Sequence, residues 1–180
     1  MKEYELTMKR TLTLVLATLT LALCASTGAA QKEKPSTPEQ LKRAVEIATL
    51  LENDPLNKNA KELSRELLLF IIQAPDVHVH LCTDVLGDYK KIKGDYAPTI
   101  SGQLTFSSAK FVIEHPDEAA DVNKEYLAGV EGVLRAYQNI KKAKPKVEIK
   151  PLEELLVKQQ AGQLADFVKQ AATAGCKTGN

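Results

Sequence analysis

The sequence predicts an all-α fold, an irregular bundle of about six helices that follows a cleaved N-terminal signal peptide. Apolar residues recur at three- and four-residue spacing in successive segments of the 180-residue chain, which is typical of helices with one buried face. Proline, glycine or asparagine separates these segments, as expected at helix ends. No segment alternates convincingly as a strand would, and residues 147–149 and then 77–79 come nearest to that pattern.

The pattern of residues 1–30 predicts a bacterial-type secretory signal peptide. A basic pair follows Met8, an uncharged apolar run extends over residues 11–25, and small residues then lead into a polar segment. The run is shorter than the ~20 apolar residues that span a bilayer. We therefore expect cleavage near Ala30, no transmembrane span in the mature chain, and a translation start at Met8 rather than Met1.

Cys24 raises the question of lipidation. A lipoprotein signal has a small residue immediately before its cysteine, whereas Leu23 occupies that position here. We therefore expect simple cleavage, with a lipidated envelope component as the alternative.

Charge and length restrict the classes of function. Cleavage removes Lys2, Lys9 and Arg10 from the 24 basic residues and Glu3 and Glu5 from the 23 acidic ones, so the mature chain is formally neutral. A neutral chain lacks the basic surplus on which general nucleic-acid binding and binding to anionic membranes depend. About 150 residues suffice for one core. We predict a flexible leader, residues 31–36, and a single helical domain, residues 37–180.

Two cysteines, Cys82 and Cys176, remain in the mature chain. In an oxidising compartment such a pair favours a structural disulfide. The sequence therefore predicts a bond that attaches the C-terminal segment to the middle of the fold, in a secreted or periplasmic protein.

The first two helices have clear end signals. Thr37 is placed to cap the first helix, Gln40 can complete a capping box, and Pro55 ends the segment. Asn57 or Asn59 can cap the second helix, whose C-terminal half is apolar on nearly every side. That composition predicts a central position for the second helix.

The middle of the chain is expected to hold a short helix and then a longer one. Residues 76–86 follow Pro75, and Gly87 is a suitable helix stop. A lysine- and glycine-bearing connection then leads to a helix over residues 98–114.

The longest helix is expected to begin at Pro116, with acidic residues in its first turn near the positive end of the helix dipole. Gly129 and Gly132 lie inside this helix, and each costs about 1 kcal/mol relative to alanine. Close approach to the small residues 107–109 would offset that cost.

The C-terminal part begins with a connector. Residues 141–150 carry five lysines and predict a solvated link. Pro151 begins the last helical region, and Gly162 is expected to break or bend it.

His78 and His80 are candidate metal ligands. On a strand they would point to the same side and could share zinc, whereas on a helix they lie about 200° apart. The flanking pattern favours a helix, and only His115 or Asp84 could supply a third ligand from elsewhere. We therefore predict no metal site and no cofactor, and retain His78, His80 and His115 as candidates to test.

The tripeptide His115-Pro116-Asp117 resembles the His-Pro-Asp signature of J-domain co-chaperones, which lies between two helices. The resemblance covers about 25 residues, and it would imply a chaperone partner bound by a basic preceding helix. That helix carries only Lys110 here, so we interpret the tripeptide as a helix end followed by a helix start. Residues 47–70 are similarly like one tetratricopeptide hairpin, but no second copy follows at that repeat's period.

The chain has no signature of catalysis. It contains neither a glycine-rich phosphate loop nor a Gly-x-Ser-x-Gly elbow, and we expect Glu125 and Glu131 to lie among solvated charges. The sequence therefore favours an exported, non-catalytic protein that binds a protein or small-molecule partner. An envelope enzyme or enzyme inhibitor with a cleft between helices is the alternative.

Overall fold

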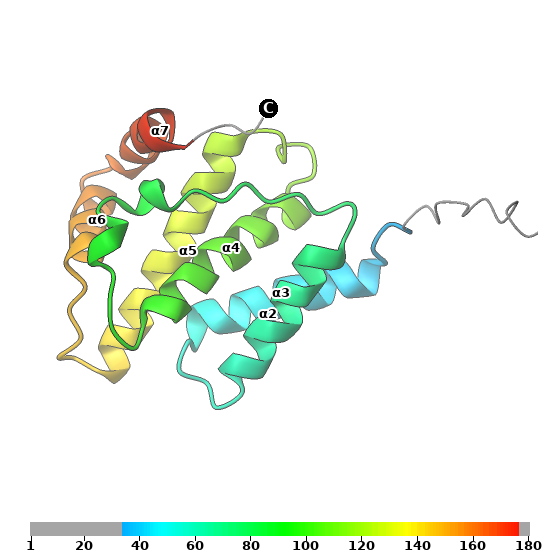
Figure 1. The fold of residues 1–180 in the computed structure, drawn as a ribbon, viewed down its shortest axis with the longest axis horizontal. Coiled ribbons are helices and arrows are strands. Elements are labelled where there is room, and N and C mark those ends of the chain that lie inside the picture. Colours follow the sequence, from blue (N-terminus) through cyan, green and yellow to red (C-terminus); the bar gives the residue numbers. More distant parts are fainter. Residues whose placement is uncertain (1–33, 177–180) are drawn as a thin grey trace, which may run out of the picture. The chain divides into compact units, whose positions relative to one another are not determined.

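A computed structural model describes residues 34–176, which form six α-helices and two short 3₁₀-helices and no strand (Figure 1). The elements are α2 (Pro38–Asn53), α3 (Ala60–Gln73), η2 (Thr83–Leu86), η3 (Tyr89–Lys91), α4 (Ala97–Glu114), α5 (Val122–Ala143), α6 (Lys150–Gln160) and α7 (Leu164–Gly175). The predicted all-α class is confirmed for this range. The predicted signal peptide, the start at Met8 and Cys24 lie outside the described residues. No helix within residues 34–176 is both long and apolar enough to cross a membrane.

Helix α5 is at the centre of the larger core. Val130, Val133 and Tyr137 follow one another at three- and four-residue spacing and are fully buried. Apolar side chains of α4, α6, α7 and η2 pack around them. Burial of this apolar stripe is the main stabilising contribution to the fold.

Helices α2 and α3 form a hairpin with a smaller core of its own. Its buried side chains are Ala44, Ile47, Ala48, Leu51, Leu67 and Phe106, the last contributed by α4. The prediction that the second helix is central is wrong. Leu67 is the one fully buried residue of α3, while Leu68, Leu69 and Ile72 are 44%, 44% and 70% exposed.

Helices α4 and α5 approach each other closely at two glycines. A Cβ atom at Gly129 would lie 2.5 Å from Ser108 Oγ, and one at Gly132 would collide with the side chain of Ser107. The predicted contact between these glycines and the small residues of α4 is therefore confirmed. It explains why a 22-residue helix keeps two residues that disfavour helical structure.

Side-chain caps begin two of the helices, α2 and α5. The Thr37–Gln40 capping box is present, and Gly162, with φ of +71°, separates α6 from α7 as predicted. The predicted start of the longest helix at Pro116 is wrong. Asp121 caps α5 by accepting hydrogen bonds from the N–H groups of Asn123 and Lys124, so the residues before it form turns.

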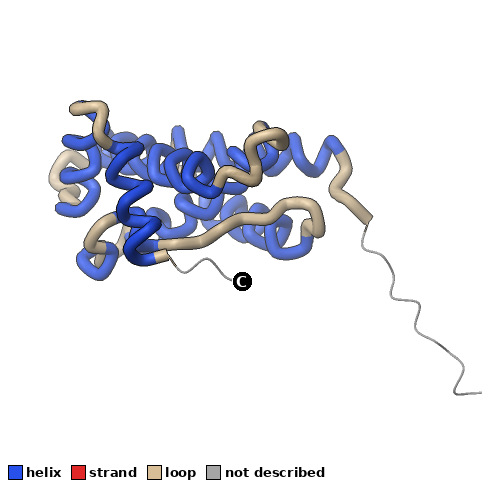
Figure 2. Tube along the Cα trace, turned by 90° about the horizontal axis from the view of Figure 1, so that it is seen from above, coloured by secondary structure: helices blue, strands red, loops and turns tan. Residues whose placement is uncertain are grey.

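The segment after α3 is not the helix that we predicted for residues 76–86. It is an irregular, extended loop that becomes helical only in η2, and Figure 2 shows it as a long loop. Besides the disulfide at Cys82, side-chain hydrogen bonds from two distant residues hold it. Asp76 accepts hydrogen bonds from the backbone and side chain of Ser36, the last residue of the predicted leader, and His80 N–H donates to Glu125 of α5 at 2.6 Å. Gly87, with φ of +73°, ends η2.

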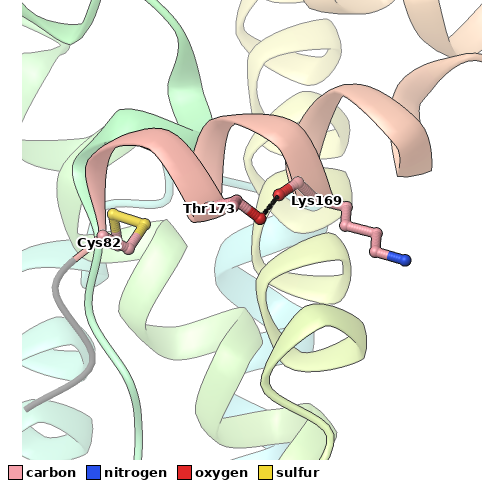
Figure 3. The surroundings of a disulfide bond; sticks show 4 residues. Cys82, Lys169 and Thr173 are labelled. Carbon is pink, nitrogen blue, oxygen red and sulfur yellow. Dashed lines mark hydrogen bonds between the residues drawn. A yellow bond between two sulfur atoms is a disulfide. The ribbon is translucent and has the colours of Figure 1, made fainter.

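A disulfide joins Cys82, just before η2, to Cys176, just after α7 (Figure 3). The two Cα atoms are 5.6 Å apart and 94 residues separate the cysteines in the chain. The predicted pairing is therefore present. It fixes the end of α7 against η2, beside the larger core.

Candidate functional site

A mixed-charge cavity of about 370 Å³ lies between α4 and α5, at the end of α2. Three carboxylates and three cations line it, together with His115 and a few apolar residues. The charged residues are Glu52, Glu114, Glu131, Lys110, Lys124 and Arg135. The charges of this cavity are balanced.

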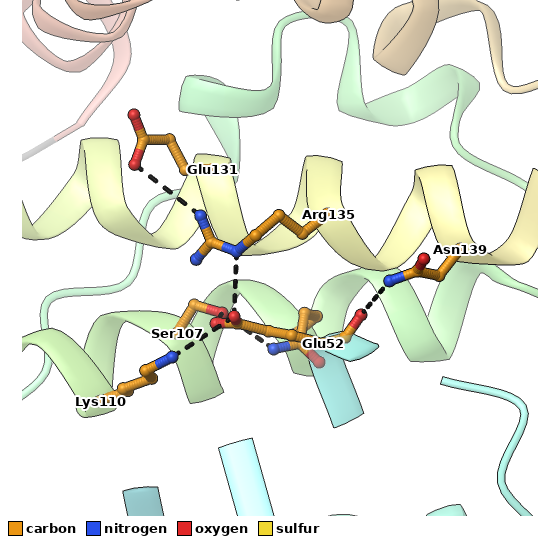
Figure 4. A network of polar contacts seen from close by, with 7 residues as sticks. Glu52, Ser107, Lys110, Glu131, Arg135 and Asn139 are labelled. Carbon is orange, nitrogen blue, oxygen red and sulfur yellow. Dashed lines mark hydrogen bonds and ion pairs between the residues drawn. The ribbon is translucent and has the colours of Figure 1, made fainter. Parts of the chain in front are cut away.

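Glu52 is the buried centre of that cluster, with a side chain only 3% exposed (Figure 4). One carboxylate oxygen accepts a hydrogen bond from Ser107 Oγ at 2.8 Å. The other oxygen accepts from Arg135 Nε at 3.0 Å and from Lys110 Nζ at 3.5 Å. Asn139 of α5 also donates to the backbone carbonyl of Glu52, at 3.0 Å.

These contacts determine the charge of Glu52. Burial alone would raise the pKa of its carboxyl. Hydrogen bonds from Arg135 and Ser107, with the positive charges of Arg135 and Lys110, outweigh burial and hold the pKa below its ordinary value. Glu52 is therefore an anion whose acceptors are occupied by groups of α4 and α5. We infer that its hydrogen bonds and ion pairs hold α2 against those helices.

A groove of about 590 Å³ lies on another side of α4, between that helix and the α2–α3 hairpin. Its apolar surface comes from the end of α2, from α3 and from the first half of α4. These residues are Leu51, Pro55, Leu68, Pro98 and Phe106. Gly102 also lines the groove, so no side chain fills its floor at that position.

The charged residues that line this groove are all positive. Lys58, Lys61 and Arg65 line it, and none of the lining residues is acidic. No ion pair among the described residues includes any of these three cations. The groove therefore presents positive charge that is available to a ligand.

A polar chain connects the two hollows. Gln103 lines the groove and donates from Nε2 to Ser107 Oγ at 2.8 Å. Ser107 lines the cavity and donates in turn to Glu52. All three side chains are buried, so the wall between the hollows is held by hydrogen bonds as well as by packing.

The three candidate histidines lie in separate surroundings. His78 is exposed, His80 Nδ1 lies 2.8 Å from Glu125 Oε2, and the His115 ring packs against Phe111 with centroids 5.0 Å apart. Within residues 34–176, no three His, Cys, Asp or Glu side chains are grouped to hold a metal ion. The structure thus does not bring these histidines together.

The prediction that Glu125 lies among solvated charges is wrong. Its side chain is fully buried, and both carboxylate oxygens contact His80, one through the backbone N–H and one through the ring. Burial raises the pKa of Glu125, and the His80 contacts oppose that effect. Glu125 therefore acts as an anchor for the extended segment.

The groove was not predicted, although part of it has a signal in the sequence. Lys58, Lys61, Arg65, Leu68 and Ile72 are spaced by three and four residues, which places them on one stripe of α3 and its approach. The first four residues of this stripe line one wall of the groove, and none of the five is buried.

No known protein family, curated protein or solved structure matches this chain. The assignment of the groove as the candidate site therefore depends on the chain's own residues.

Proposed function

We propose that this chain is a non-catalytic binding protein that is exported to an oxidising compartment. We propose further that the groove between the α2–α3 hairpin and α4 is its binding site. The observation that supports this proposal is the combination found in the groove. Leu68 and Pro98 are exposed there, above the buried side chains of Leu51, Pro55 and Phe106. Three cations line the same groove, and none of them is in an ion pair within residues 34–176. Concave sites with an apolar lining and a few polar groups are the usual form of a small-molecule site.

The exposure of α3 adds to this argument. Single exposed leucines are ordinary, but Leu68 is part of a groove and Ile72 follows it on the same stripe. Burying a leucine side chain contributes about 1.5–3 kcal/mol. A ligand that covers this wall would therefore gain binding free energy that the unliganded fold leaves unused.

Export is the second part of the proposal. The signal-peptide pattern of the sequence supports it, and so does the Cys82–Cys176 disulfide, because disulfides persist in oxidising compartments. The alternative of an enzyme or inhibitor acting through the α4–α5 cavity has less support. The Glu52 oxygens are already bonded there and the surrounding charges are balanced.

The proposal is tested with N-phenyl-1-naphthylamine, a neutral apolar dye that fluoresces when it is buried. We expect a saturable rise in fluorescence on titration of the purified protein. Leu68→Lys should weaken dye binding by about tenfold or more, the equivalent of one lost leucine contact.

Leu69→Lys is the matched control, because Leu69 is as exposed as Leu68 but does not line the groove. Unchanged binding by the Leu69 variant would localise the dye to the groove. Equal losses in both variants, or no saturable binding at all, would refute the proposal.

A further inference from the structure

We infer that the ligand of the groove is a single-chain amphiphile with one anionic head group, of the chemical class of a medium-chain carboxylate. This inference rests on the proposed binding function and adds the ligand's chemistry to it. It follows from the sign of the charge, the order of residues along α3 and the size of the groove.

The sign of the charge requires an anion. Lys58, Lys61 and Arg65 would bring three positive charges near a ligand, and no lining carboxylate would repel an anionic head group. Hydrogen bonds from lysine and arginine to a carboxylate are among the stronger ones in proteins. A cationic head group would meet three like charges and no carboxylate among the residues that line the groove.

The order of residues along α3 favours a ligand whose anion and apolar part belong to one molecule. The stripe begins with Lys58 and Lys61, continues through Arg65, and becomes apolar at Leu68, the last residue of α3 that lines the groove. The buried ring of Phe106 supplies the apolar surface of α4. A ligand that lies along α3 therefore meets the cations before it meets Leu68, while the buried side chains of Leu51 and Pro55 line another part of the groove.

The size of the groove favours a small amphiphile over a protein helix. A volume of about 590 Å³ is within the range of small-molecule sites. A standard protein interface instead buries about 800 Å² on each partner.

The test compares decanoate with decanol as competitors of bound N-phenyl-1-naphthylamine, because the two share one tail and differ in the charge of the head. We expect decanoate to displace the dye at about tenfold lower concentration than decanol. Added salt should weaken displacement by decanoate and leave that by decanol unchanged, since exposed charges are screened.

Arg65→Glu and Lys169→Glu provide the matched pair of variants. Arg65 is exposed and lines the groove, whereas Lys169 is an exposed residue of α7 whose side chain points to solvent (Figure 3). Arg65→Glu should abolish the advantage of decanoate without affecting decanol, and Lys169→Glu should preserve it.

The possible failures are distinguishable. Equal displacement by decanoate and decanol would overturn the anionic ligand class and leave the binding function standing. Loss of both competitors in Arg65→Glu would overturn the role assigned to the head group. If the dye itself does not bind, the proposed function fails and this inference fails with it.

Discussion

Glu52 shows how one buried carboxylate joins three helices. It belongs to α2 and is bonded to Ser107 and Lys110 of α4 and to Arg135 of α5. Its pKa lies below the ordinary value of 4.5, because bonds from Arg135 and Ser107 outweigh the effect of burial. An acid with a lowered pKa in the folded state stabilises the fold above its unfolded-state pKa. This contribution is lost as the pH falls through the folded-state value.

We therefore expect Glu52→Gln to lower the free energy of unfolding by about 1–3 kcal/mol at neutral pH. The difference between wild type and variant should shrink as the pH falls from the ordinary carboxyl value through the lowered pKa of folded Glu52, because the wild-type carboxyl becomes protonated over that range. Urea denaturation at neutral and acidic pH measures both quantities.

Glu66→Gln is the control for Glu52→Gln. Glu66 also accepts from an arginine, Arg43 at 2.8 Å, but both side chains of that pair are about half exposed. An exposed pair contributes about 0–1 kcal/mol, so this variant should lose little stability. Comparable losses in the two variants would contradict the structural role assigned to Glu52.

At the scale of elements, the approach of α5 to α4 depends on the absence of a side chain at Gly132. Alanine normally favours a helix over glycine by about 1 kcal/mol. At this position the added methyl would collide with Ser107, which is itself held by Glu52 and Gln103. We expect Gly132→Ala to destabilise the protein by about 1–3 kcal/mol, as overpacked cores do.

Thermal or urea unfolding measures the effect of Gly132→Ala. Gly102→Ala is the comparison, because its methyl would meet only the ring of Phe106, at 3.2 Å. A Gly132→Ala protein as stable as wild type would show that α4 and α5 do not require this contact.

Features encoded by local spacing could be predicted at this scale. The Thr37 cap, the glycine contact between α4 and α5, and the break at Gly162 are examples. The segment of residues 76–86 could not be predicted in this way. Its His80 N–H is bonded to Glu125, 45 residues away, so a distant carboxylate replaces the carbonyl that a helix would supply.

At the scale of the whole molecule, the described chain combines a larger core around α5 with a smaller one in the α2–α3 hairpin. The groove lies where α4 meets that hairpin. The sequence analysis predicted the helices on both sides of it but not the groove, because its lining comes from α2, α3 and α4 together. The apolar end of α3 was interpreted as core, whereas Leu68 and Ile72 are left uncovered.

The most direct test of the account is to map a bound anionic amphiphile on the protein by two-dimensional amide NMR. On titration with decanoate, we predict the largest shifts in residues 58–68 and 98–106, around the groove. The amides of Lys110, Lys124 and Arg135, around the α4–α5 cavity, should change little. Shifts concentrated at that cavity, or spread evenly over the protein, would contradict the central claim that the groove is the binding site.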